Sequence, residues 1–416
     1  MKILMAHPTG NSNVRAVASA FIQAEMLLEF NTTIAINLSS KWLSIIPESV
    51  KSQLLRRNYA IDTGLLKSHP YRELARMIMP KIGLRKFSVN EKSWAGIDAV
   101  YRDLDHKVSK RLHSIVRSTN CTSVYAYEDG ALQTFEKAKS LGLTCIYDLP
   151  IAYWSTGRRL MLEEASRLPA WSVTMSGSIH DSEEKLARKS AEISLADVIV
   201  VPGNFVADSL PAWIRDKQII ISPFGSPLIS AGFKNILEKK KSEKLRVLFV
   251  GSMSQRKGLA DLFEAIKLVN TTSIELIVMG SPIAPMEFYY NELPGFTYMS
   301  NRPHDQVLEL MRSCDVFCLP SIVEGRALVM QEAMSQGLPL IITANTGGAD
   351  LIIEGKTGFL VPIRSPQVIA EKLQWFLDNR DCISKMGLMA QEHAEKYTWD
   401  SYGATIVTSL LSRINN

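Results

Sequence analysis

Long hydrophobic runs are absent from this sequence, and no apolar stretch approaches the ~18 residues that a membrane-spanning helix requires. Cysteine is also scarce, with five residues at Cys121, Cys145, Cys314, Cys318 and Cys382. Because their number is odd and their positions are scattered, we expect no disulfide framework. No second Cys or His pair accompanies Cys314 and Cys318 at the spacing of a zinc site, so we expect buried side chains and no metal site.

The N-terminal residues lack the features of an export signal. MKILMAHPTGN has one Lys and a short apolar stretch, without the long apolar segment and small-residue cleavage site of a signal peptide. Of the 416 residues, 46% are hydrophobic and 21% are charged, as in ordinary globular proteins, and the length suits two domains better than one. We therefore expect a soluble, cytoplasmic protein with two domains.

The net charge of +5 is unevenly distributed. Between Lys41 and Arg117 the chain has sixteen Lys and Arg residues but only seven Asp and Glu residues. Apolar residues are interleaved with basic ones in VKSQLLRRNYAI and LLKSHPYRELARMIMPKIGLRKF, as expected for a surface that rests on anionic lipid. A solvated helical surface would explain the pattern as well. No helix-turn-helix, zinc or RNA-binding signature accompanies the charge, so nucleic acid is not an expected partner.

Short apolar strands alternate with helical patterns along the chain, which is the rhythm of an α/β protein. In the first half the predicted strands are KILMAHP, TTIAINL, SVYAY, LTCIYDL and DVIVVP. The Lys-rich passage NILEKKKSEK contains no strand and is the predicted linker. The rhythm then restarts with LRVLFVG, IELIVMG, VFCLPS and PLIITA.

This rhythm predicts two doubly wound, Rossmann-like domains that face each other across a cleft, with the carboxyl ends of their strands as the ligand edge. We assign residues 1–228 to the first domain and residues 229–398 to the second. Residues 399–416 form one more amphipathic helix, which we expect to cross back to the first domain.

The turn in VLFVGSMSQRKGLADLFEAI is a candidate phosphate site. A buried strand ends at Gly251 and a helix begins near Gly258, and the turn between them carries Ser252, Arg256 and Lys257. Backbone amides at a strand end and a helix N-terminus, beside two cations, suit an anion. The spacing is not that of the dinucleotide fingerprint, and a basic turn without a ligand is the alternative.

A second candidate site lies in CLPSIVEGRALVMQEAMSQGLP. The loop holds Ser321, Glu324 and Gly325, and a helix is predicted from about residue 327 to 336. If the intervening residues were helical, Glu324 and Glu332 would lie about 12 Å apart. At that distance they cannot share a proton, but they could hold the two ends of an elongated ligand whose anionic middle rests on the helix N-terminus, as in a nucleoside diphosphate sugar.

Glu332 needs a partner if it is not at the surface. Val329, Met330, Ala333 and Met334 surround it with apolar groups, so an unpaired carboxylate there would be costly. A surface position is the alternative.

Two other motifs carry no predicted chemistry. EGKT at residues 354–357 resembles the end of a phosphate-binding loop, but no strand leads into it, and we predict a turn. Asp103 and Asp105 form an Asp-x-Asp pair, but they lie in a helical pattern that directs them to different faces.

At these residues the sequence resembles the retaining nucleotide-sugar glycosyltransferases of family 4, which have the GT-B fold. The resemblance covers the second domain almost completely, through VLFVGSMSQRKG, CDVFCLPSIVEGRALVMQEAMSQGLP, NTGGADLIIEGKTGFLVP and YTWD. The family's pair of glutamates with seven residues between them corresponds to Glu324 and Glu332.

The resemblance implies roles for the residues of the second domain. Lys257, helped by Arg256, would hold the donor diphosphate, Glu332 would bind the nucleotide ribose and Glu324 would face the donor sugar. The other implied donor-binding residues are Gly251, Ser252, Gly258, Gly280, Ser321, Gly325, Arg326, Ala327 and Leu328. The family commonly has EGFG where this chain has EGRA, so the Arg326 side chain is expected to add a contact.

The first domain resembles the family less closely and is expected to bind the acceptor. Three loop residues and two acidic residues at strand ends are the acceptor-side candidates: Gly10, Asn11, Asn13, Glu128 and Asp129. Relatives often have a His after the strand that matches LTCIYDLP, and the nearest polar residue here is Asp148, which we take as a catalytic candidate. His7 is either a ligand-facing residue or a satisfied histidine at a strand end.

The resemblance implies a retaining, metal-independent transferase that moves a hexose from a UDP- or GDP-sugar to a saccharide or lipid-linked acceptor, in polysaccharide or glycolipid assembly. No cofactor is expected besides the substrate nucleotide sugar. The protein would be cytoplasmic, with a possible peripheral position on the inner face of the plasma membrane. A sugar-nucleotide epimerase, a phosphorylase or an inactive nucleotide-sugar-binding protein are the alternatives.

Overall fold

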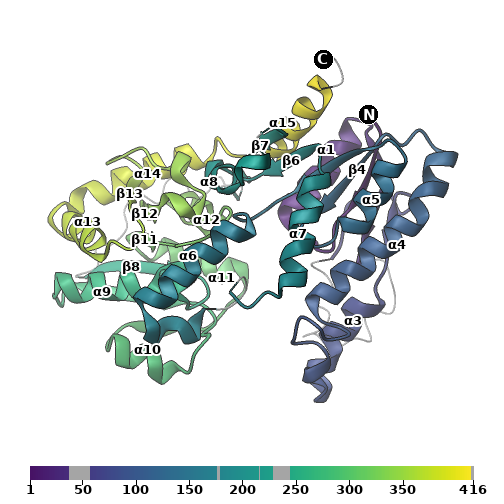
Figure 1. The fold of residues 1–416 in the computed structure, drawn as a ribbon. Helices are drawn as coiled ribbons and strands as arrows, with labels where there is room; N and C mark the ends of the chain where they lie inside the picture. The colour runs from purple at the N-terminus through teal and green to yellow at the C-terminus, as the bar shows by residue number, and fades with distance from the viewer. Residues whose placement is uncertain (37–56, 176–178, 215, 228–243, 414–416) are drawn as a thin grey trace.

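The computed structural model describes residues 1–36, 57–175, 179–214, 216–227 and 244–413. It contains two parallel β-sheets, each wound with helices, and confirms the predicted two-part α/β architecture (Figure 1). Most of the predicted linker NILEKKKSEK and most of the basic stretch VKSQLLRRNYAI lie outside the described residues.

The first sheet has the order β3-β2-β1-β4-β5-β6-β7, and all its strand pairs are parallel. Its strands are β1 (Ile3–Ala6), β2 (Leu27–Thr32), β3 (Leu66–Ser68), β4 (Ser123–Tyr127), β5 (Thr144–Asp148), β6 (Val198–Val201) and β7 (Gln218–Ile221). The strand order reverses direction between β1 and β4, so the loops that follow these two strands open at the place where such sheets bind ligands.

One predicted strand of this sheet is misplaced. The sequence TTIAINL was expected to be a strand, but β2 is formed by the preceding residues LLEFNT. Polar Glu29 and Asn31 interrupt the apolar pattern of β2, and both accept hydrogen bonds from Arg111 of α4 (Ile97–Ser118). Since the polar side chains break the apolar run, the sequence pattern does not identify this strand.

Helices cover both faces of the first sheet. They are α1 (Ser12–Gln23), α3 (Tyr71–Ile78), α4 (Ile97–Ser118), α5 (Leu132–Ser140), α7 (Glu183–Leu195) and α8 (Asn204–Ser209). Apolar side chains of α4, α5 and α7 form one core with the sheet, and those of α1 form the core on the other face. The predicted DLD pair lies in α4, where Asp103 pairs with Lys107 and Asp105 accepts hydrogen bonds from the first amides of α5.

The second sheet has the order β10-β9-β8-β11-β12-β13 and is also parallel throughout. Its strands are β8 (Leu245–Val250), β9 (Ile274–Met279), β10 (Thr297–Met299), β11 (Val316–Leu319), β12 (Leu340–Thr343) and β13 (Gly358–Val361). Its helices are α9 (Leu259–Val269), α10 (Met286–Glu292), α11 (His304–Arg312), α12 (Leu328–Ser335), α13 (Pro366–Asp378) and α14 (Ile383–Ala394). Cys314 and Cys318 are buried as predicted, and EGKT forms the turn before β13.

The chain crosses between the two parts in both directions. As expected, the last helix, α15 (Trp399–Ser412), packs on α1 of the first part (Figure 1), and the hydroxyl of Ser222 donates a hydrogen bond of 2.8 Å to the carbonyl oxygen of Tyr402. In the opposite direction, α6 (Trp154–Arg167) and the short helix η4 (Pro169–Thr174) pack into the core of the second sheet. A division of the chain at residue 228 therefore leaves α6 and η4 of the first segment in the second core.

Candidate active site

The basic turn after β8 has its backbone fixed by close packing. It forms the short helix η7 (Gln255–Lys257), which ends at Gly258. Gly258 has φ +73°, and a Cβ there would overlap the carbonyl oxygen of Pro320, so another residue would strain the turn and displace the next loop. Gly280, after β9, packs equally closely against Gly251. The two cations of the turn therefore project from a rigid backbone.

Both cations of this turn contact Glu324, in the loop after β11. Nζ of Lys257 lies 2.6 Å from Oε1 of Glu324, and the guanidinium of Arg256 donates a hydrogen bond to the same oxygen. Burial lowers the pKa of Lys257, and the negative charge of Glu324 opposes this shift. No residue in the described part of the chain bonds to Oε2, so this oxygen is open to a ligand hydroxyl.

The two serines assigned to donor binding differ in their contacts. The hydroxyls of Ser252 and Ser254 share a hydrogen bond of 3.2 Å. The hydroxyl of Ser321 is buried and has no hydrogen-bond partner within the described ranges. A buried hydroxyl without a partner is rare, which marks Ser321 as a place where a ligand or water would bond.

The loop between β11 and α12 lies against the first domain. A Cβ on Gly325 would overlap the carbonyl oxygen of Pro150, in the loop after β5, so the two parts of the chain touch here. Leu328 begins α12, and its amide belongs to the first turn, where N–H groups lack helical acceptors. The amide of Ala327 instead donates a hydrogen bond of 3.1 Å to the carbonyl oxygen of Thr346, which leaves it unavailable to a phosphate.

The side chain of Arg326 has a different place from the one that the sequence suggested. Its guanidinium is fully buried, donates to both carboxylate oxygens of Asp350 at 2.8 and 3.0 Å, and donates at 2.9 Å to the carbonyl oxygen of Gly347. It also donates to Gln331 and lies 5.0 Å from the ring centroid of Tyr397. Its contacts are therefore within the protein: the side chain joins Gln331 of α12 to the segment after β12 that contains Gly347 and Asp350, and the expected contact with the donor sugar nucleotide is not formed by its buried guanidinium.

Glu332 lines a cavity of about 340 Å³ that lies between the two sheets' domains. The lining residues are Ser12, Gly225, Pro227, His304, Leu328, Glu332 and Trp399. Nδ1 of His304 lies 3.7 Å from Oε1 of Glu332. Burial raises the pKa of Glu332, and the charge of His304 opposes this shift. The Glu332 carboxylate is therefore neither fully exposed nor fully buried, because it lines a cavity.

Four helices begin at this cavity. Their first residues, which line it, are Ser12 of α1, His304 of α11, Leu328 of α12 and Trp399 of α15. The N-termini of helices carry partial positive charge and unpaired amides, so their convergence favours a ligand with negative charge.

Of the predicted residues, Gly10 and Asn11 lie in the loop before α1, and Asn13 is the second residue of that helix. Asn11 is the N-cap of α1, but its side chain makes no capping hydrogen bond and is exposed. Asn13 is buried. Since Ser12 between them lines the cavity with Glu332, this loop faces the second domain, as predicted for a loop at the cleft.

His7, directly after β1, and Asp148, at the end of β5, face each other across the end of β4. Nε2 of His7 lies 3.7 Å from Oδ2 of Asp148, and Nδ1 of His7 accepts a hydrogen bond from the amide of Thr9. Burial lowers the pKa of His7 to about 3 and raises the pKa of Asp148 to about 7. At neutral pH His7 is therefore neutral, and Asp148 is near its midpoint of protonation. Both side chains are buried, so neither presents an open surface to an acceptor.

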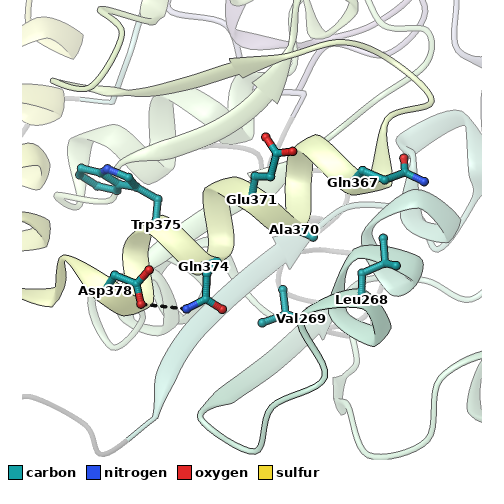
Figure 2. A pocket seen from close by; sticks show the side chains of 8 residues that line it. All are labelled: Leu268, Val269, Gln367, Ala370, Glu371, Gln374, Trp375 and Asp378. Atoms are coloured by element: carbon teal, nitrogen blue, oxygen red, sulfur yellow. Dashed lines mark hydrogen bonds between the residues drawn. The ribbon is translucent and has the colours of Figure 1, made fainter.

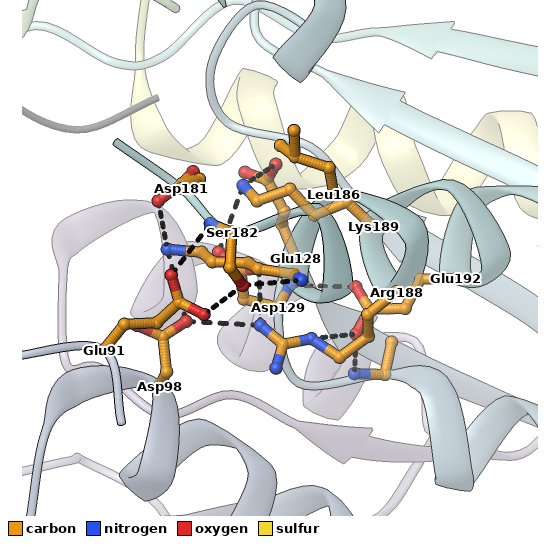
Figure 3. A network of polar contacts seen from close by, with 12 residues as sticks. Glu91, Asp98, Glu128, Asp129, Asp181, Ser182, Leu186, Arg188, Lys189 and Glu192 are labelled. Carbon is orange, nitrogen blue, oxygen red and sulfur yellow. Dashed lines mark hydrogen bonds and ion pairs between the residues drawn. The ribbon is translucent and has the colours of Figure 1, made fainter. Parts of the chain in front are cut away.

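Glu128 and Asp129 lie in a network of ion pairs (Figure 3). Lys189 contacts Glu128 at 2.8 Å and Asp129 at 3.1 Å, and Arg188 contacts Asp129 at 3.0 Å. Asp129 has φ +69°, and its amide donates to Glu192. These carboxylates, which the sequence assigned to the acceptor side, are thus neutralised by α7 and hold the loop after β4 in place.

A supporting network beneath the basic turn was not visible in the sequence. The side-chain amide of Gln255, the residue before Arg256, donates to Glu164 of α6 at 2.7 Å and to Asp261 at 2.8 Å. Arg167 donates to the same two carboxylates. These groups are far apart in the sequence and have no motif spacing, so only their packing reveals that α6 supports the turn.

His304 and Trp399 were also missed as cavity residues. Each is the first residue of a helix, and neither belongs to a motif of the strand-end loops that were singled out. The YTWD segment, which includes Trp399, was the only signal in the sequence that could have found one of them.

A second hollow lies away from these residues, between α9 and α13 (Figure 2). It has a volume of about 570 Å³ and is lined by Leu268, Val269, Gln367, Ala370, Glu371, Gln374, Trp375 and Asp378. None of the predicted site residues contributes to it, so it is not part of the candidate active site. Across the described ranges, no group of three or more His, Cys, Asp or Glu side chains is positioned to hold a metal ion.

Residues 233–396 match the family of group 1 glycosyl transferases. The chain is 31% identical to the D-inositol 3-phosphate glycosyltransferase of Corynebacterium efficiens over 259 residues, which cover 56% of this chain and 61% of the relative. It is 29% identical to the sulfoquinovosyl transferase of Arabidopsis thaliana over 235 residues, which cover 56% of this chain and 44% of the relative. The matches thus span about half the length of these curated relatives.

Two solved structures show the same fold over the whole chain. The sucrose-phosphate synthase of Thermosynechococcus elongatus superposes with a TM-score of 0.61 at 16% identity and covers 100% of this chain and 99% of its own. Anabaena HepE in complex with UDP superposes with a TM-score of 0.59 at 14% identity and covers 99% and 100%. The predicted GT-B fold is confirmed, and residues 233–396 are similar to the group 1 glycosyl transferases.

Proposed function

We propose that this chain is a retaining glycosyltransferase that moves a hexose from a UDP- or GDP-sugar to an acceptor hydroxyl, in the assembly of a surface polysaccharide or glycolipid. The observation that carries the proposal is the pairing of Lys257 and Arg256 with one oxygen of Glu324, at the carboxyl end of the second sheet. The match of this domain to group 1 glycosyl transferases and the UDP in the complex of Anabaena HepE support it.

In this proposal Lys257 and Arg256 neutralise the donor diphosphate. An ammonium has three donors and a guanidinium has five, so both groups can hold phosphate oxygens while they keep their contact with Oε1 of Glu324. Fixed cations of this kind stabilise the negative charge that develops on a leaving diphosphate. The step then needs no metal ion, and no cofactor enters it.

The two glutamates hold the hydroxylated ends of the donor. Oε2 of Glu324 accepts a hydrogen bond from the sugar, while Glu332 accepts from the ribose inside the cavity of about 340 Å³. Burial raises the pKa of Glu332, and a ribose hydroxyl that donates to the ionised carboxylate would offset this shift. His304, whose Nδ1 lies 3.7 Å from Oε1 of Glu332, opposes the rise in the pKa of Glu332.

The first domain binds the acceptor. The loop with Gly10, Asn11 and Asn13 lies at the cavity, so an acceptor held there approaches the donor from the side of α1. Attack on the same face that the diphosphate leaves gives retention, and positioning of the two reactants supplies much of the rate. Asp148 is buried against His7 and serves as a positioning residue for the loops after β1 and β5.

The test uses single variants with matched controls. Lys257→Ala and Glu332→Ala should each lower the rate of nucleotide release about 100-fold or more, as measured with UDP-glucose, UDP-galactose and GDP-mannose and a panel of acceptors. Exposed residues of the same domain provide the controls, and Lys356→Ala and Glu371→Ala should retain the rate. A thermal-shift screen of the same nucleotide sugars selects the donor beforehand, because a ligand that binds only the native state raises Tm.

Other outcomes identify the alternatives. Full turnover by Lys257→Ala or Glu332→Ala would refute the assigned site. Conversion of the donor sugar without an acceptor indicates an epimerase, and dependence on inorganic phosphate indicates a phosphorylase. Binding of a nucleotide sugar without transfer or slow hydrolysis indicates a binding protein.

A further inference from the structure

A protruding segment after α3 has no role in the proposed transfer. Residues 78–97 contain two short helices, η2 (Met79–Ile82) and η3 (Arg85–Phe87), and neither of them buries a residue. Figure 1 shows α3 at the lower end of the first domain, beyond the body of its sheet. The segment is nevertheless anchored at its base, since the amide of Ala95 donates to the carbonyl oxygen of Phe87 and Arg72 donates to that of Trp94, both at 2.9 Å.

This segment exposes large apolar side chains close together in the sequence. They are Ile78 (47% exposed), Ile82 (61%), Leu84 (40%), Phe87 (42%), Val89 (56%), Trp94 (52%) and Ile97 (51%). Single exposed apolar side chains are normal on a protein surface, but seven within twenty residues are not. The segment therefore exposes more apolar surface than a stretch of this length usually does.

The exposed charges of the segment are all positive. Lys81, Arg85, Lys86 and Lys92 are exposed, whereas the carboxylate of Glu91 turns inward and accepts hydrogen bonds from the amide and hydroxyl of Ser182. The next acid in the chain, Asp98, is buried and pairs with cations of α7 (Figure 3). The structure therefore turns the local acids inward and leaves cations beside the apolar groups.

We propose that residues 78–97 bind the surface of an anionic lipid bilayer. Aromatic and branched apolar side chains enter the boundary between headgroups and acyl chains, and neighbouring Lys and Arg side chains attract anionic headgroups. A second copy of this chain fits less well, because the cations of one segment would face those of the other. No helix in the described part of the chain is long and apolar enough to cross a bilayer, so the contact is with the surface. This proposal does not depend on the transfer reaction.

The test is sedimentation of the full chain with vesicles of phosphatidylcholine, with and without about one-third phosphatidylglycerol. The protein should bind the anionic vesicles at least about tenfold more strongly, and less strongly as salt is added. An apolar double variant, Ile82→Ser with Phe87→Ser, and a charge variant, Lys81→Glu with Arg85→Glu and Lys86→Glu, should each lose about tenfold or more of this binding.

Matched controls separate a specific surface from general charge and hydrophobicity. Leu162→Ser with Trp213→Ser replaces two apolar side chains of similar exposure on other elements and should bind as the unmodified chain does. Lys356→Glu with Lys385→Glu and Lys396→Glu changes the net charge equally, on exposed positions of the second domain. Since η2 and η3 bury no residue, the Tm of the test variants should not change, which shows that they fold.

Trp94 gives an independent readout of depth. Brominated lipids should quench part of the tryptophan fluorescence, and Trp94→Phe should remove that part. Equal binding to neutral and anionic vesicles, or unchanged binding by the apolar variant, would overturn the proposal. Concentration-dependent dimerisation that the same variants abolish, without vesicle binding, would replace the bilayer with a second copy of the chain.

Discussion

Replacement of Glu324 by glutamine removes the negative charge that holds Lys257 and Arg256 together. Nζ of Lys257 lies 2.6 Å from Oε1, and the Lys257 and Glu324 side chains are 12% and 11% exposed. Removal of one partner of a buried ion pair costs about 3–5 kcal/mol of unfolding free energy. Because Arg256 is 30% exposed and partly solvated, we expect a smaller loss for Glu324→Gln, about 2–4 kcal/mol without nucleotide.

The loss should become a gain when nucleotide binds. In the proposed site the diphosphate of the unmodified protein shares both cations with Glu324, whereas in the variant Glu324 no longer competes for them. UDP or GDP should therefore bind the variant about tenfold more tightly, which corresponds to about 1.4 kcal/mol. Transfer should nevertheless fall about 100-fold, because the Glu324 carboxylate that would bind the donor sugar is gone.

Scanning calorimetry with and without nucleotide measures both effects. If the second domain unfolds as a unit, Tm should fall by roughly 5–10 °C in the apo variant, and nucleotide should restore more of it than it adds to the unmodified protein. Glu354→Gln, at an exposed carboxylate in a turn of the same domain, is the control and should change neither value. An unchanged Tm together with weaker nucleotide binding by Glu324→Gln would refute the assigned cation pair.

Two further changes test other parts of the structure. The pKa of Asp148 is about 7 in the folded chain, above its value in the unfolded chain. Between about pH 4 and pH 7 the folded state therefore keeps a proton that the unfolded state has lost, so the stability that this group contributes falls as pH rises. Asp148→Asn should thus raise Tm at pH 8 and leave it nearly unchanged at pH 4, as thermal unfolding across pH would show; an equal shift at both pH values would argue against the burial. A Cβ at Gly325 would overlap the Pro150 carbonyl oxygen, so Gly325→Ala should displace this contact between the domains and lower transfer at least tenfold. Gly355→Ala is the control, because its added Cβ meets open space; its positive φ should cost only about 1–2 kcal/mol of stability. Equal activity of the two glycine variants would show that the contact is not needed.

Much of the fold could be predicted because it depends on local patterns. Strands such as SVYAY and VFCLPS are buried on both faces, so continuous apolar runs mark them, and the glycines of the turns punctuate the chain. The edge strands β3 and β10 were not predicted, because each has only three residues and carries no such run, and the edge strand β13, with the short run FLV, was missed as well. β2 was displaced because its polar residues are paired with Arg111 and do not mark a loop.

The candidate site could be predicted in part for the same reason. Arg256, Lys257 and Glu324 come from strand-end loops, and parallel strands bring such loops to one edge. Which groups they would contact could not be predicted. Arg326 lies in the same motif, yet its guanidinium pairs with Asp350, 24 residues further along the chain, and Glu128 and Asp129 are neutralised by a helix about 60 residues away.

The sequence by itself determined the α/β class, the two sheets and the residue types gathered at their carboxyl ends, since periodicity and turn chemistry act within a few residues. Only the tertiary structure decided that α6 supports the basic turn of the second domain and that Glu332 opens into a cavity shared with Ser12 and His304. These arrangements arise from packing between segments far apart in the chain, and no spacing of residues within a single sequence indicates which distant segments will pack together.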